Sequence, residues 1–121
     1  MIHAYDKNYL SKAQNNLASM LDFAVYDLEE DLSHFYLKFL QSKICSQFER
    51  GESTVIVGKS GVELAIEILG DETLAEKYRP VANRTAEYWC GWALAYFQWK
   101  TNLSFKEINK YIRITEGVSL Y

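Results

Sequence analysis

Apolar residues recur at steps of three and four positions over residues 6–29, and polar side chains occupy the other side. This spacing places the apolar residues on one stripe of an α-helix. Asp6 can accept hydrogen bonds from the unpaired N–H groups at the start of that helix. We therefore predict one long amphipathic helix that buries Leu10, Ala13, Leu17, Met20, Leu21, Ala24 and Leu28.

A second helical pattern covers residues 33–48. Ser33 is a suitable N-cap, and Gly51 follows where a helix would end. The next segment, STVIVGKSG, contains β-branched residues that favour a strand. An isolated strand would leave its backbone groups unpaired, so we expect an ordered loop over 53–59. The second helix should direct Phe35, Tyr36, Phe39, Leu40, Ile44 and Phe48 toward a core.

Ser60 and Glu63 form the S-x-x-E pattern of a capping box, which predicts a short helix that ends at Gly70. Residues 71–83 are polar and contain the single proline, so we expect a loop or one helical turn there.

The stretch YWCGWALAYFQW at 88–99 belongs to a helix that Thr85 or Asn83 can cap and that continues to residue 101. Only Glu87, Gly91 and Gln98 form a polar strip on it. A helix that is apolar nearly all round is typically buried, so we expect this one at the centre of the fold. The apolar residues form two sectors of the helix surface. One sector contains Tyr88, Trp89, Trp92, Ala95, Tyr96 and Trp99, and the other contains Ala86, Cys90, Ala93, Leu94 and Phe97.

The same rings allow a functional interpretation. Aromatic faces attract cations, and binding pockets are largely apolar, so the rings could bind a partner or a flat or cationic ligand. Burial of each ring stabilises a fold by about 1.5–3 kcal/mol, which explains the rings without any ligand. We expect the core role, and the candidate binding surface comprises Tyr88, Trp89, Trp92, Tyr96 and Trp99.

Composition favours one all-α domain over residues 1–121. Glycine and proline are scarce, which suits long helices better than a many-turned β-sandwich. The net charge of −3 gives no overall footprint for nucleic acid. We expect no signal peptide, because MIHAYDKNYL has no charged region followed by an apolar run, and no stretch reaches the ~20 apolar residues of a membrane span. We expect a cytoplasmic protein without membrane contact, in which Cys45 and Cys90 act as small buried hydrophobic residues in a reducing compartment.

Catalytic and cofactor chemistry has no support in the sequence. His3 and His34 lie outside any metal-binding spacing, and we expect His3 to be mobile near the terminus. We therefore predict no enzyme, no metal and no cofactor. The acidic run over 22–31 could dock a basic partner, but charge runs are usually solvated faces, so we favour a solvated helix end with favourable negative charge before the next helix.

Residues 94–112 read as two helical patterns joined by TNLS, with a capping box at Ser104 and Glu107. Lys106, Lys110 and Arg113 lie on or after the second pattern. Such a helix–turn–helix could insert its second helix into a major groove. The basic charge is sparse for phosphate binding, so we expect ordinary helix packing here and no nucleic-acid binding by this chain alone.

Several stretches together carry a resemblance. IHAYDKNYL, MLDFAVYDL, GKSGVELA and EYWCGWALAYFQW resemble a family of bacterial proteins common in Firmicutes, and the resemblance covers nearly the whole chain. This resemblance implies that the chain is the all-helical N-terminal module of helix–turn–helix regulators of the Cro/repressor (XRE-like) type. Such members continue into a DNA-binding domain where this chain ends in ITEGVSLY, so we expect a trimmed or stand-alone form of the module. Some members of that family are encoded beside toxin-like genes, so the resemblance also implies an antitoxin-like or regulatory role.

The sequence thus predicts an all-α bundle of about five helices around residues 88–101, enclosed by 6–29 and 33–48. We expect a non-catalytic regulatory or protein-interaction module of a bacterial transcriptional regulator or antitoxin-like protein. Its partner would be a second copy, a toxin-like protein or a DNA-binding domain. A small-ligand sensor with a closed aromatic pocket and DNA binding through 94–112 are the alternatives.

Overall fold

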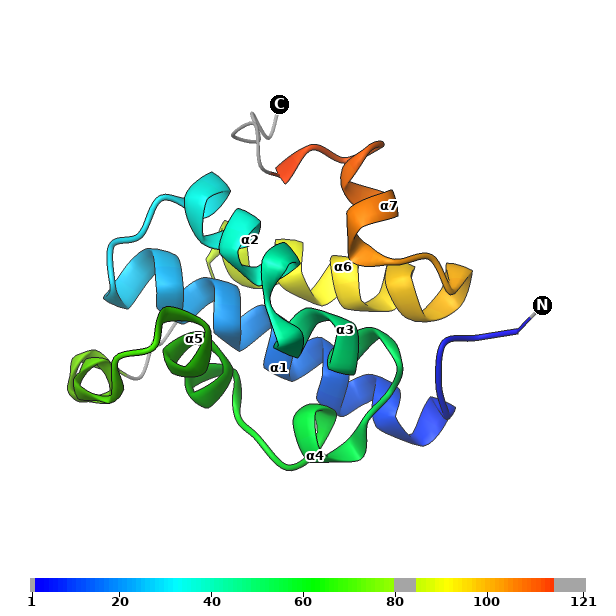
Figure 1. The fold of residues 1–121 in the computed structure, drawn as a ribbon, viewed down its shortest axis with the longest axis horizontal. Coiled ribbons are helices and arrows are strands. Elements are labelled where there is room, and N and C mark those ends of the chain that lie inside the picture. Colours follow the sequence, from blue (N-terminus) through cyan, green and yellow to red (C-terminus); the bar gives the residue numbers. More distant parts are fainter. Residues whose placement is uncertain (1, 80–84, 115–121) are drawn as a thin grey trace.

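The structure is a computed structural model that describes residues 2–79 and 85–114, and its regular elements are all helical in this part of the chain. The predicted all-α single-domain bundle is confirmed (Figure 1). Two 3₁₀ segments, Lys7–Tyr9 and Glu72–Lys77, and a π-helical segment, Phe23–Asp27, accompany the α-helices. The α-helices are α1 (Leu10–Asp22), α2 (Leu32–Gln41), α3 (Lys43–Glu49), α4 (Ser53–Ile56), α5 (Gly61–Leu69), α6 (Ala86–Thr101) and α7 (Phe105–Asn109).

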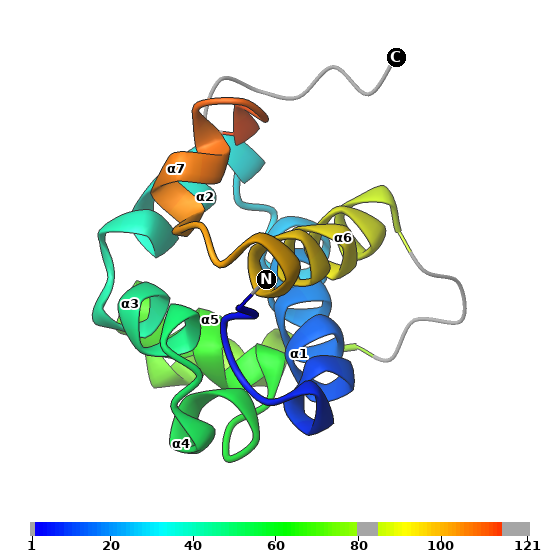
Figure 2. The same cartoon turned by 90° about the vertical axis from the view of Figure 1, so that its right-hand side faces the viewer.

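Helix α1 packs against α4, α5 and α6 (Figures 1 and 2). It follows a 3₁₀ turn that Asp6 caps by accepting from the N–H of Asn8 (2.8 Å). The predicted apolar stripe is confirmed, because Ala13, Leu17, Met20, Leu21 and Ala24 are completely buried, with Leu10 and Leu28 half-buried at the ends.

Two glycines allow neighbouring helices to approach the backbone of α1. A Cβ atom on Gly91 of α6 would lie 2.7 Å from the carbonyl oxygen of Leu17. A Cβ atom on Gly61 of α5 would lie 2.5 Å from the carbonyl oxygen of Asn16. Both distances are shorter than a carbon atom tolerates, so only glycine fits at either position. The same turn of α1 is therefore held closely from two sides.

The expected single helix over 33–48 is two helices. Ser42 has an extended backbone (φ −86°, ψ 157°) and its hydroxyl accepts from the N–H of Cys45, so it ends α2 and caps α3. The start also differs, since Asp31 rather than Ser33 occupies the N-cap of α2. The predicted core residues of this region are confirmed as buried: Phe35, Tyr36, Phe39, Leu40, Ile44 and Phe48.

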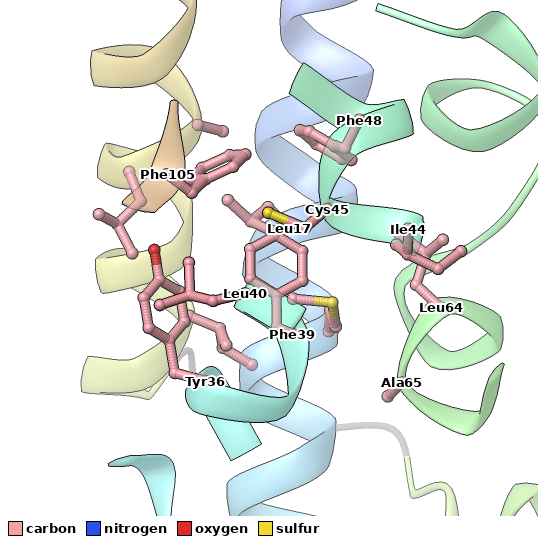
Figure 3. Packing of buried hydrophobic residues seen from close by; sticks show 14 of the residues in the cluster. Leu17, Tyr36, Phe39, Leu40, Ile44, Cys45, Phe48, Leu64, Ala65 and Phe105 are labelled. Carbon is pink, nitrogen blue, oxygen red and sulfur yellow. The ribbon is translucent and has the colours of Figure 1, made fainter. Parts of the chain in front are cut away.

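Aromatic rings from α2, α3 and α7 meet in this part of the core (Figure 3). The ring of Phe105 packs edge-on against Phe39, with centroids 5.2 Å apart, and against Phe48 at 5.9 Å. Edge-to-face pairs of this kind stabilise by about 0.5–1.5 kcal/mol beyond the area they bury. Helix α7, although short, is thereby fixed to the bundle by Phe105, and Ile108 of the same helix is buried as well.

The ordered loop expected over 53–59 is a short helix followed by a turn. Val55 and Ile56 of α4 are buried, which favours the compact turn over the strand that their β-branched side chains suggest. The side-chain amide of Asn16 donates to the carbonyl oxygens of Ile56 (2.6 Å) and Lys59 (2.9 Å). This segment therefore connects α3 to α5 and is hydrogen-bonded directly to α1.

Other sequence-derived boundaries agree with the structure, although the helix expected over 6–29 is α-helical only over Leu10–Asp22. Both capping boxes are formed, at the start of α5 and at the start of α7. Gly70 ends α5 with φ at 74°, and Gly51 follows α3 with φ at 75°. Thr85 caps α6 by accepting from the N–H of Tyr88. Asn83, the alternative cap, lies outside the described residues.

Candidate interaction surface

Helix α6 packs along α1 on one side and exposes most of its rings on the other, so the prediction that this helix is buried all round is wrong. Two members of the polar strip lie on the inner side of α6: Gly91 is buried against α1, and Gln98 is only 1% exposed. A close approach to α1 requires small residues, and Gly91 and Ala95 provide them. Gln98 donates its amide to the carbonyl of Leu103 (3.0 Å), which accommodates it in the interior.

Two of the five predicted surface residues lie inside the fold. Tyr88 is buried, and its hydroxyl donates to Asn15 on α1 (3.4 Å). Trp99 is buried as well, and its indole N–H donates to the carbonyl of Tyr5 (2.8 Å). Both side chains therefore fasten α6 to the N-terminal part of the chain.

His3 is held in place, contrary to our expectation that it is mobile. Its ring stacks on the indole of Trp99, with centroids 4.0 Å apart and planes inclined by 15°. The adjacent N–H of Ala4 donates to the carbonyl of Trp99 (2.9 Å). These contacts order the segment before the first helix.

The other three predicted residues share one exposed face of α6 with Phe97, which is not among the five residues of the predicted binding surface. We call Trp89, Trp92, Tyr96 and Phe97 the aromatic face. Their side chains expose 53%, 39%, 38% and 43% of their surface, respectively. Trp89 and Trp92 pack edge to face with centroids 6.1 Å apart. The ammonium group of Lys100 lies 5.8 Å from the ring centroid of Tyr96. Figure 2 shows α6 along the outside of the bundle.

A groove of about 400 Å³ runs beside the aromatic face. We call it the apolar groove. It is open at the surface, and it includes Trp89 but not Trp92, Tyr96 or Trp99. This arrangement differs from the closed pocket that the ligand-sensor alternative predicts. The lining side chains are Ala86, Trp89, Cys90, Ala93, Leu94, Phe97 and Ile112.

Both cysteines have environments that suppress thiol reactivity. Burial raises the pKa of the Cys90 thiol, and Glu87 adds to this effect. Burial raises the pKa of the Cys45 thiol further, with the neighbouring carboxylate of Glu49 as the second cause. Because the thiolate is the nucleophilic and metal-binding form, neither residue is activated for covalent chemistry.

The basic residues of the 94–112 segment lie on its surface. Lys106, Lys110 and Arg113 are exposed, but α7 comprises only the five residues Phe105–Asn109. A helix of that length extends only about 7.5 Å, which is short for a recognition helix in a major groove. Direct DNA binding through these residues stays an untested alternative.

Carboxylates of the acidic run form contacts within the fold. Asp22 is buried and accepts a hydrogen bond from the Thr85 hydroxyl at the start of α6. Asp27 accepts from the backbone N–H of Arg79 (3.2 Å), and Glu30 lies 3.6 Å from Lys38. These three carboxylates thus form two hydrogen bonds and one ion pair within the fold.

Within residues 2–79 and 85–114, no cluster of three or more histidine, cysteine or acidic side chains could hold a metal ion. Each helix of this part is too short or too polar to cross a bilayer.

The sequence contains a signal that could have identified the exposed face. Gly91 and Ala95 are four residues apart, and small residues at this spacing mark a face where two helix backbones approach closely. Residues on the opposite side, including Phe97, Ala86 and Ala93, must then point away from α1.

Comparisons of the chain with protein-family models, curated proteins and solved structures found no match.

Proposed function

We propose that this chain is a non-catalytic protein-interaction module that contacts its partner through the aromatic face and the apolar groove. The observation that supports the proposal is the grouping of four large, partly exposed rings on one side of a single helix. Monomeric proteins rarely expose contiguous apolar patches larger than a few hundred Å². Tryptophan, tyrosine and phenylalanine are enriched at the centres of protein interfaces, where they supply much of the binding energy.

The remainder of the molecule is consistent with this role. The rings sit on a helix whose inner side is fixed to α1 by the Gly91 contact, so the surface is rigid before any partner arrives. Binding through a preformed surface loses less conformational entropy than binding through a flexible segment. A regulatory or antitoxin-like protein would use such a module to associate with other proteins.

Site-specific photo-crosslinking in the host cell tests the proposal. A photoreactive amino acid at the exposed Ala93, between Trp89 and Phe97, should yield covalent protein adducts. The matched control is the same residue at Val57, which is 44% exposed at the end of α4. Adducts from position 93 and none from position 57 would support the proposal. Absence of adducts at position 93, or equal adducts at both positions, would refute it.

The apolar groove favours a second candidate, a sensor for a small apolar molecule. Its volume of about 400 Å³ falls within the range of roughly 300–1,000 Å³ that such pockets occupy. However, the lining offers only the Trp89 indole and the Cys90 thiol as polar groups, so little in it fixes the orientation of a ligand. An apolar aromatic compound that stabilises the native chain against heat but does not stabilise Ala93→Glu would favour the sensor.

A further inference from the structure

We infer that the partner of the aromatic face is a second copy of this chain, and that the two α6 helices pack antiparallel about a two-fold axis at Ala93. The inference rests on the proposed function, because it identifies the partner of the same surface. Most homo-oligomers are symmetric, and a two-fold contact requires a surface that is complementary to itself.

The exposed stripe of α6 has this property. Ala93 is at its centre, and aromatic rings stand four residues before it, at Trp89, and four residues after it, at Phe97. A two-fold axis through Ala93 places alanine against alanine and Trp89 against Phe97 of the second copy. The small central residue permits close approach of the helices, while the rings on either side interdigitate. A parallel arrangement would instead place Trp89 against itself, with the two largest side chains in conflict.

The apolar groove supplies the recess for the rings of the second copy. Its lining includes the small residues Ala86, Cys90 and Ala93, together with Trp89 and Ile112. Each copy therefore carries both a projecting ring and a hollow beside it. Ala86 lies seven positions before Ala93, and Lys100 lies seven positions after it. An antiparallel partner therefore places the flexible stem of Lys100 over Ala86.

The exposed area is at the lower limit for a specific dimer. With roughly 150–250 Å² per aromatic side chain, the exposed fractions correspond to about 260–430 Å² for the four rings. The alanines and Ile112 raise this to roughly 400–600 Å² in each copy. A pair of copies would bury about 800–1,200 Å², close to the ~1,000 Å² that a specific interface requires. The dimer should accordingly be weak and depend on concentration.

Charge also favours an identical partner over a highly charged one. Helix α6 contains two charged residues, Glu87 and Lys100, in its sixteen residues. Glu87 is half-buried to one side of the aromatic face, and the ammonium group of Lys100 lies against the ring of Tyr96. A basic peptide or a nucleic acid would find few charges to pair with, whereas a second apolar stripe matches the surface.

Sedimentation velocity of the purified full chain over low to high micromolar concentrations tests the inference. The 14.1 kDa monomer should convert to a dimer as concentration rises. Ala93→Glu and Ala93→Lys should each weaken the dimer by more than about tenfold, because each places like charges together at the axis. An equimolar mixture of the two variants should form dimers again, since opposite charges then meet. Circular dichroism checks that each variant keeps its helical content.

The matched control is Val57→Glu, which makes the same kind of change at an exposed apolar residue that follows α4 and lies outside α6. It should dimerise as the unmodified chain does. A chain that remains monomeric at every concentration would overturn the inference, as would dimers that survive Ala93→Glu or that Val57→Glu also abolishes. A monomeric chain whose position 93 still crosslinks to other proteins would refute the self-association alone. A monomeric chain without such crosslinks would refute the proposed function as well.

Discussion

Replacement of Gly91 by alanine tests the close contact between α1 and α6 on which the exposure of the aromatic face depends. The new Cβ atom would lie 2.7 Å from the carbonyl oxygen of Leu17 and 2.8 Å from the Cα atom of Ala18. Favourable non-bonded contacts of carbon lie at about 3.5 Å or beyond. Both obstructing atoms belong to the backbone of a buried helix, so α6 must withdraw from α1 by roughly 0.7 Å.

Two opposing terms determine the size of the effect. Overpacking of a well-packed interior costs about 1–3 kcal/mol, and the upper part of this range applies because the obstructing backbone cannot rotate away. Alanine is better than glycine inside a helix by about 1 kcal/mol. The free energy of unfolding should therefore fall by about 1–2 kcal/mol in Gly91→Ala.

Urea unfolding followed by far-ultraviolet circular dichroism measures this difference, at concentrations where the chain is monomeric. Ala93→Gly provides the control, since residue 93 is exposed two positions further along the same helix. It should lose about 1 kcal/mol through helix propensity alone. If Gly91→Ala were as stable as the unmodified chain or more so, the contact between α1 and α6 would be looser than the structure shows.

Three further expectations follow from individual contacts. Acrylamide should quench the two tryptophans of the aromatic face strongly and Trp99 weakly in the dilute monomer; uniform protection would contradict their exposure. Thr85→Val should lower the free energy of unfolding by about 2 kcal/mol, because α6 loses its cap and the buried Asp22 loses its donor; an unchanged urea midpoint would contradict this. Hydrogen bonds with Ser60 lower the pKa of Glu63 in the folded chain. The stability that these bonds contribute is fully present above the pKa of about 4.3 that Glu63 has in the unfolded chain. It is lost as the pH falls through the lower pKa of the folded chain. The Glu63→Gln variant should lose less free energy of unfolding between pH 5 and pH 3 than the unmodified chain does. The same dependence of the free energy of unfolding on pH in both chains would refute this.

Much of the fold was predictable because local signals agreed with the tertiary structure. The apolar stripe of α1 and both capping boxes require only residues close together in the sequence. The break at Ser42 was missed because no glycine or proline marks it, and an N-cap serine resembles any other polar residue of a helix. The strand-like residues of α4 form a helical turn because burial of Val55 and Ile56, together with the hydrogen bonds from Asn16, outweighs their local preference.

The orientation of α6 was less accessible to sequence reasoning. Rings and small apolar residues surround nearly the whole helix, so hydrophobicity alone does not distinguish the inner side from the outer side. Residue size distinguishes them, because the side that contacts α1 contains Gly91 and Ala95 while the rings need more room. Of the predicted surface, Trp89, Trp92 and Tyr96 are exposed, and Tyr88 and Trp99 are anchored within the fold.

The position of α1 between α5 and α6 has a consequence for synthesis of the protein on the ribosome. Helix α1 is made first, yet α6 begins roughly 60 residues after α1 ends. At ~5–20 residues per second, translation of that interval takes about 3–12 s. Helix α5 emerges earlier and can cover one side of α1 through Gly61, while the side that receives Gly91 stays open. A nascent chain that stalls before α6 would therefore present the apolar stripe of α1 to chaperones and to other nascent chains.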